Sequence, residues 1–143
     1  MPDDWETFDD GASGVSFRYP RELETSYIRL VDWPPSVAVD AGPIECVAAG
    51  DETARAGRTD PVTVNGETYC VTRVTEGAAG SIYTLYAYAI PVGDDVVFLR
   101  FSSRAPQCGN YDEPSRTECE RERVAFSMDE VVGRIAATLR IAE

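Results

Sequence analysis

Residues 62–74 read VTVNGETYCVTRV and carry the clearest local structural signal in the chain. Within them, Asn65-Gly66 separates two runs that are rich in β-branched residues. Asn-Gly is a preferred sequence for a type I′ turn, because both turn residues must accept a positive φ. The stretch therefore predicts a β-hairpin, and with it a domain built on antiparallel strands.

A second hairpin is predicted from two aromatic-rich runs, residues 82–90 and 96–103, which are joined by a loop at 91–95. We expect Ile90 to face Val96, a register that gives the hairpin one wholly apolar face. The opposite face of the hairpin then carries four large side chains: Tyr86, Tyr88, Phe98 and Arg100.

This mixed face is the predicted binding surface of the protein. Tyrosine and arginine on a rigid sheet are typical anchors of protein and sugar interfaces, since they bury a large area at a low entropic cost. The alternative is that another strand, the N-terminal segment or a loop covers the face, because a monomer rarely exposes so large an aromatic patch.

The N-terminal part of the chain changes character near residue 15. Residues 1–14 are polar and acidic, and we expect a linker there, leading into a single disulfide-stapled domain at 15–143. Val15, Phe17 and Tyr19 alternate with polar residues, which predicts a half-buried strand.

The C-terminal part predicts an amphipathic helix. Ser127 and Glu130 form a capping box, and apolar residues at helical spacing follow it as far as Ile141. Short strands are predicted at 36–40 and 44–48. Antiparallel strands packed by a terminal helix give the predicted fold class, an α+β domain.

Composition restricts the chemistry that the protein can perform. The 143 residues include 43% hydrophobic residues, as in an ordinary globular domain, and no apolar run is long enough to span a membrane. Histidine is absent and all 13 basic residues are arginine. The chain therefore lacks the commonest metal ligand, the commonest general base and every side-chain amine nucleophile.

The net charge of −12 indicates which partners the surface attracts. A surface this acidic repels nucleic-acid phosphates and anionic lipid headgroups, so we expect neither a nucleic-acid partner nor membrane insertion. Cations and basic proteins are favoured partners. The alternative interpretation is that the charge only keeps the domain soluble.

Four cysteines are present, and their spacing does not fit a zinc site, which would need all four thiolates in a chain without histidine. We expect two disulfides and an oxidising compartment. Three pairings are possible. The pairing of neighbours closes the shortest loops and fits the predicted strands, so the expected bonds are Cys46–Cys70 and Cys108–Cys119.

The polar region at 104–125, predicted as a loop, contains the candidate metal site. A hard cation such as calcium prefers several oxygen ligands on a flexible loop, and a disulfide would preorganise that loop. The candidate ligands are Asn110, Asp112, Glu113 and Glu118, with Glu120 just outside the disulfide. The alternative is a solvated loop whose carboxylates are neutralised by Arg116, Arg121 and Arg123.

No motif for an enzyme is present. A Gly-x-Ser-x-Gly elbow and a glycine-rich phosphate loop are both missing, and no histidine or lysine is available to activate a serine. Carboxylate pairs such as Asp94-Asp95 and Asp112-Glu113 leave a glycan hydrolase as the third hypothesis. We expect a non-catalytic domain without a cofactor, unless the acidic loop binds calcium.

The segment that contains Gly14, Ser16, Phe17, Tyr19 and Pro20 resembles the start of the PsbP-like family of small extracytoplasmic domains. The order of predicted strands and terminal helix extends this resemblance over most of the chain. Members include photosystem accessory proteins and bacterial lipoproteins. The resemblance implies a PsbP-like sandwich and a place in the cell envelope, although the region of Cys108 and Cys119 is not part of the family pattern.

The expected location is outside the cytoplasm, with the chain periplasmic, secreted or held at the cell surface as a lipoprotein. Residues 1–5 contain neither the basic nor the apolar part of an export signal. We therefore expect Met1 to follow a leader that has been removed. The expected function is to bind a protein or another envelope component.

Overall fold

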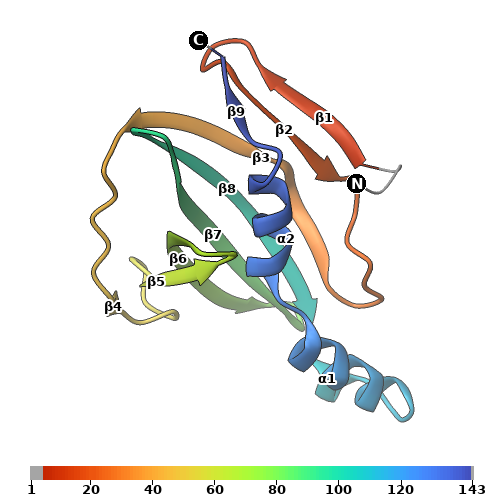
Figure 1. The fold of residues 1–143 in the computed structure, drawn as a ribbon. Coiled ribbons are helices and arrows are strands. Elements are labelled where there is room, and N and C mark those ends of the chain that lie inside the picture. Colours follow the sequence, from red (N-terminus) through yellow and green to blue (C-terminus); the bar gives the residue numbers. More distant parts are fainter. Residues whose placement is uncertain (1–4, 143) are drawn as a thin grey trace.

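A computed structural model describes residues 5–142, which form two antiparallel sheets and two short α-helices (Figure 1). The smaller sheet has the order β1-β2-β9, and the larger has the order β3-β8-β7-β6-β5-β4. The strands of the smaller sheet are β1 (Trp5–Asp10), β2 (Val15–Pro20) and β9 (Arg140–Ile141). The strands of the larger sheet are β3 (Arg29–Ala41), β4 (Ala49–Gly50), β5 (Arg58–Val64), β6 (Glu67–Ala78), β7 (Ser81–Val92) and β8 (Asp95–Pro106).

The helices lie between β8 and β9 in the chain. A short 3₁₀ turn, η1 (Cys108–Asn110), precedes α1 (Ser115–Ala125), and α2 (Met128–Ala136) follows. Figure 1 shows α2 between the smaller sheet and one face of the larger sheet, with α1 beyond the N-terminal end of α2. We call the face of the larger sheet toward α2 its inner face. Across residues 5–142, no helix has the length and apolar character needed to cross a membrane.

The predicted α+β class is wrong, because the protein is mainly β. Strands hold 52% of residues 5–142 and the short helices 17%. The predicted terminal helix stops at Ala136 instead of near Ile141, since Arg140 and Ile141 join β2 as β9. Its start is confirmed: the Ser127 hydroxyl caps α2 by accepting a hydrogen bond from the Glu130 backbone N–H.

A row of aromatic contacts joins the two sheets through the core. Tyr19 on β2 contacts Trp33 edge to face at 6.1 Å, and Trp33 contacts Phe101 on β8 in the same way at 5.1 Å. Val132 and Ile135 of α2 are fully buried in the same core. Apolar side chains from both sheets and α2 therefore form one continuous hydrophobic cluster, which fixes α2 against the inner face.

The first predicted hairpin is confirmed. Val64 pairs with Glu67 across the turn, where Asn65 and Gly66 have φ of 52° and 84°. The second hairpin also exists, but its predicted register is wrong by one residue, because Ile90 pairs with Val97.

The turn explains this register difference. β7 continues to Val92, which pairs with Asp95, so only Gly93 and Asp94 form the connection. Gly93, the first of the two turn residues, has a φ of 61°. A two-residue hairpin turn needs a positive φ at this position, which glycine adopts without strain. Because side chains alternate between the two faces of a sheet, a register shift of one residue places Tyr86 and Tyr88 on the opposite face from Phe98 and Arg100.

Three further expectations differ from the structure. Residues 5–10, predicted as linker, form β1 and pair with β2, whereas residues 1–4 of that linker lie outside the described part. Residues 44–48, predicted as a strand, do not form one. The region 104–125, predicted as a loop, holds the end of β8, η1 and α1.

Candidate functional site

The four predicted binding residues do not share one face. Tyr86 and Tyr88 point to the inner face, where their rings stack on Phe101 with centroids 5.2 and 5.9 Å apart. Tyr88 is 0% exposed, so its ring is core and not surface. Phe98 and Arg100 alternate with core residues of β8 and therefore lie on the outer face, where Phe98 is half-buried and Arg100 is exposed.

The hydroxyl of Tyr88 is the polar link between sheet and helix. It donates a 2.7 Å hydrogen bond to Oδ1 of Asp129 in the first turn of α2. Burial, and then the Asp129 charge, raise the pKa of Tyr88 above its ordinary value. This bond fixes the beginning of α2 over the inner face.

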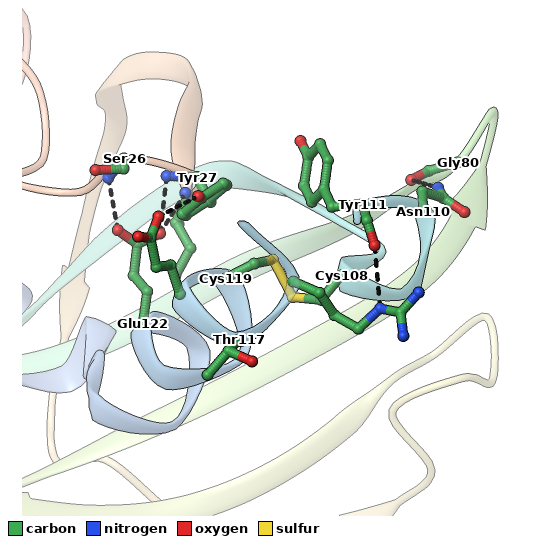
Figure 2. Close-up of a disulfide and its surroundings, with 12 residues drawn as sticks. Ser26, Tyr27, Gly80, Cys108, Asn110, Tyr111, Thr117, Cys119 and Glu122 are labelled. Carbon is green, nitrogen blue, oxygen red and sulfur yellow. Dashed lines mark hydrogen bonds between the residues drawn. A yellow bond between two sulfur atoms is a disulfide. The ribbon is translucent and has the colours of Figure 1, made fainter. Parts of the chain in front are cut away.

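The predicted calcium ligands are not brought together. Asn110 donates to the Gly80 carbonyl (Figure 2), and Glu113 accepts from the backbone N–H of Thr117 at 2.8 Å. Hydrogen bonds from Thr117 lower the pKa of Glu113. Glu118 accepts from the Tyr27 hydroxyl, and Asp112 and Glu120 are exposed. Among residues 5–142, no group of three or more acidic or cysteine side chains is placed to hold a metal ion.

Both predicted disulfides are present. Cys46 is bonded to Cys70 of β6, and Cys108 of η1 is bonded to Cys119 of α1 (Figure 2). Cys108 and Cys119 are both buried. Two disulfides in one small domain indicate folding in an oxidising environment outside the cytoplasm.

Glu122 of α1 holds the connection between β2 and β3. Its carboxylate accepts hydrogen bonds from three consecutive backbone N–H groups, those of Ser26, Tyr27 and Ile28, at 2.5 to 3.0 Å (Figure 2). The ring of Tyr27 also contacts Tyr111, with centroids 5.6 Å apart. Charge-assisted hydrogen bonds are stronger than neutral ones. Glu122 therefore holds α1 and the connection between β2 and β3 firmly together, and the two form one wall of an adjacent cavity.

A cavity of about 420 Å³ lies beside this wall, between residues 20–25 and the junction of α1 with α2. We call it the acidic groove. The large apolar side chains of its lining come from parts of the chain that are far apart in sequence: Trp5, Leu23, Phe126 and Val131. Its charged lining consists of Glu22, Glu24, Glu122, Glu130 and Arg134.

Most of the charge in the acidic groove is negative and available to a ligand. The guanidinium of Arg134 lies over the Trp5 ring, 5.0 Å from its centroid, and Glu122 is occupied by backbone N–H groups. Glu22, Glu24 and Glu130 are exposed, and they take part in none of the salt bridges formed within residues 5–142. The groove therefore combines an apolar floor with a rim of uncommitted carboxylates.

Sequence reasoning missed the acidic groove because its parts are far apart in the chain. Glu22 and Glu24 flank Leu23, and this short alternation was the one local signal. Trp5 was expected in a linker, and Glu130 was interpreted only as a helix-capping residue. Only the pairing of β1 with β2 and the packing of α2 bring these residues to one place.

Comparisons with known proteins leave the chain without an assigned family. No family model matches the sequence, and no curated protein matches it. A protein from Bacteroides thetaiotaomicron, whose crystal structure was solved at 1.50 Å resolution, aligns with 100% of this chain at 15% identity and a TM-score of 0.41. The chain spans 44% of that protein. A structural similarity this low supports no conclusion about the family or the function of this chain. The PsbP-like resemblance stays a prediction.

Proposed function

We propose that this chain is a non-catalytic binding domain that acts outside the cytoplasm, and that the acidic groove takes a basic segment of a partner protein. The observation that carries the proposal is the juxtaposition of three uncommitted glutamates with an apolar floor in one cavity. The partner segment would have arginine or lysine side chains beside one bulky apolar side chain.

Charge complementarity supports this choice of partner. The net charge of −12 gives the whole molecule an attraction for basic proteins, and the groove concentrates that charge at one place. Complementary charges at a rim increase the association rate and specify the partner. The apolar floor of Trp5, Leu23, Phe126 and Val131 supplies the buried contact area that affinity requires.

The groove is also preformed, which lowers the entropic cost of binding. Glu122 ties the 26–28 segment to α1, and the Cys108–Cys119 bond ties α1 to the end of β8. A site whose walls are fixed before binding loses little conformational entropy when a ligand arrives.

The disulfides support a location in the periplasm, on the cell surface or in the extracellular medium. All four cysteines are paired, and structural disulfides persist in such compartments. We propose that the domain is either secreted or tethered to the envelope as a lipoprotein, where basic segments of other exported proteins are its partners.

The test uses three synthetic peptides of equal length. The first alternates arginine with leucine, the second has glutamate for arginine, and the third has serine for leucine. We expect only the first to change the tryptophan fluorescence, through Trp5 in the groove, and to bind measurably in calorimetry. Its affinity should fall as salt increases.

Matched variants separate groove binding from general attraction to an acidic protein. The groove triple is Glu22→Gln, Glu24→Gln and Glu130→Gln, and the control triple is Glu45→Gln, Glu67→Gln and Glu76→Gln, which removes the same charge from exposed positions elsewhere. We expect the groove triple to weaken binding at least tenfold and the control triple to weaken it about twofold or less. Equal losses in the two triples would refute the proposal.

A further inference from the structure

A second cavity of about 300 Å³ lies on the other side of the helix junction, between α2 and the inner face of the larger sheet. Phe126 and Ser127 line both this cavity and the acidic groove. We call it the hydroxyl pocket, because five residues with hydroxyl groups line it: Thr84, Tyr86, Tyr88, Ser103 and Ser127. Its volume is at the small end of the range for ligand pockets, roughly 300–1,000 Å³.

Charged side chains of both signs complete the lining of the hydroxyl pocket. Arg73 and Arg123 supply guanidinium groups that only donate, and Asp129 supplies a carboxylate that only accepts. The apolar remainder includes Ile82 and Phe126. A ligand group that satisfies this lining must both donate and accept hydrogen bonds at neighbouring atoms.

Contacts within the protein hold the charged groups of the hydroxyl pocket in place. Asp129 is fixed by the hydroxyl of Tyr88, and Tyr86 lies opposite Arg73 in the strand ladder. The guanidinium of Arg73 lies 3.5 Å from Asp60 and 4.0 Å from Glu52. Arg73 is therefore paired with carboxylates, and the remaining charged lining is one guanidinium, Arg123, and one carboxylate, Asp129, so the two signs are close to balance.

We infer that the hydroxyl pocket binds a neutral polyhydroxylated ligand, a monosaccharide or disaccharide. A sugar hydroxyl donates to Asp129 and accepts from Arg73, Thr84 or Ser103, which is the combination that the lining demands. The apolar wall suits the C–H faces of a sugar ring. A fixed constellation of this kind binds without reorganisation, which favours affinity for a small ligand.

Ionic ligands fit the hydroxyl pocket less well. A carboxylate or phosphate would place its charge beside Asp129, and an amine would place its charge beside Arg73 and Arg123. A zwitterionic amino acid matches both charges, but it leaves the hydroxyls of Thr84 and Ser103 without new partners. The number of hydroxyl groups favours the sugar.

The test is saturation-transfer NMR of the intact chain with glucose, galactose, N-acetylglucosamine and maltose, each at up to millimolar concentration. Glucuronate, glycine and alanine serve as the ionic comparison. We expect saturable binding of at least one neutral sugar and none of the ionic compounds. No binding of any sugar, or binding of the amino acids in place of sugars, would overturn the inference.

Two adjacent substitutions show where a sugar binds. Asp129→Asn keeps the shape of the side chain and an acceptor for Tyr88, and Glu130→Gln removes the same charge from the acidic groove. We expect Asp129→Asn to weaken sugar binding about tenfold, the loss of one charged hydrogen bond. Glu130→Gln should leave it unchanged, and equal effects would overturn the inference. Peptide binding to the groove is measured separately, so either proposal can fail alone.

Discussion

Asp129 and Glu130 are adjacent in the first turn of α2, yet they line different cavities. Asp129 turns toward the sheet and accepts a hydrogen bond from Tyr88 at 2.7 Å, whereas Glu130 is exposed and lines the acidic groove. Both carboxylates also lie at the positive end of the helix dipole, where negative charge is stabilising. α2 therefore separates two sites of opposite character, one hydroxyl-rich and one acidic.

The buried position of Tyr88, together with its bond to Asp129, makes stability fall at alkaline pH. Burial is the main cause that raises the pKa of Tyr88, and the Asp129 charge adds to it. In the unfolded chain a tyrosine loses its proton near pH 10. Below that pH the contribution of Tyr88 is constant. Above it the unfolded state is favoured, and stability falls by about 1.4 kcal/mol for each pH unit.

Urea denaturation between pH 8 and pH 12 measures this effect. We expect Tyr88→Phe to be less stable than the parent at pH 8 by about 1–3 kcal/mol, because Asp129 loses its partner. We also expect the variant to lose less stability between pH 10 and pH 12. Identical slopes for the two proteins would contradict the assignment of the alkaline loss to Tyr88.

Local signals in the sequence predicted the parts of the fold that depend on neighbouring residues. Asn65-Gly66 fixes its hairpin because the turn needs positive φ at both positions, and Ser127 begins α2 because a side-chain oxygen there satisfies a free N–H. The disulfide pairing followed from loop length. Each of these features involves residues that are close in the chain.

Features that depend on register or on distant packing were not predictable in the same way. The pattern between 82 and 103 fits either of two registers, and only the conformation of Gly93 selects the one that buries Tyr88. The end of α2 depends on β9 pairing with β2. The acidic groove and the hydroxyl pocket both need α2 in place, so neither was visible in the sequence.

Gly133 of α2 packs directly against Val64 of β5, in the first hairpin. A Cβ at this position would come within 2.5 Å of Cγ1 of Val64, and Gly133 is buried. Alanine at a helix interior usually stabilises by about 1 kcal/mol relative to glycine. Here we expect Gly133→Ala to lower the free energy of unfolding by about 1–3 kcal/mol. The steric overlap of the new Cβ with Val64 costs more than the higher helix propensity of alanine contributes.

A second substitution distinguishes overlap from other causes. Val64→Ala removes the clashing methyl group, so the loss caused by Gly133→Ala should be smaller in the Val64→Ala background than in the parent. Urea denaturation of the four proteins gives the coupling energy. If Gly133→Ala stabilises the parent, the close packing of α2 on β5 is not as described.

The two disulfides should contribute similar stability, because each closes a loop of moderate length. Their sequence separations are 24 and 11, and loop-closure entropy gives about 3 kcal/mol for each. We expect each paired Cys→Ala variant to lose about that amount in urea denaturation. Reductant should destabilise the parent and leave a chain without cysteines unaffected. A thiol titration of native protein should find no free thiol, and free thiols would contradict the extracytoplasmic location.

Glu122 is the residue whose loss should most affect the wall of the acidic groove. Its two carboxylate oxygens accept from three backbone N–H groups, and glutamine offers one acceptor oxygen and an NH₂ group that faces the donors. We expect Glu122→Gln to destabilise the protein by about 1.5–3 kcal/mol, the range for hydrogen bonds to a charged group. Glu118→Gln, which loses one exposed contact with Tyr27, is the matched control with little expected effect.

Hydrogen exchange shows whether this loss is local. The amides of Ser26, Tyr27 and Ile28 should exchange faster in Glu122→Gln, while those of the central strands β7 and β8 keep their protection, because local opening exposes only the released segment. Binding of the arginine–leucine peptide should weaken in the same variant, since the groove wall is no longer fixed. Unchanged exchange at 26–28 would show that other contacts hold this segment and that Glu122 does not preorganise the groove.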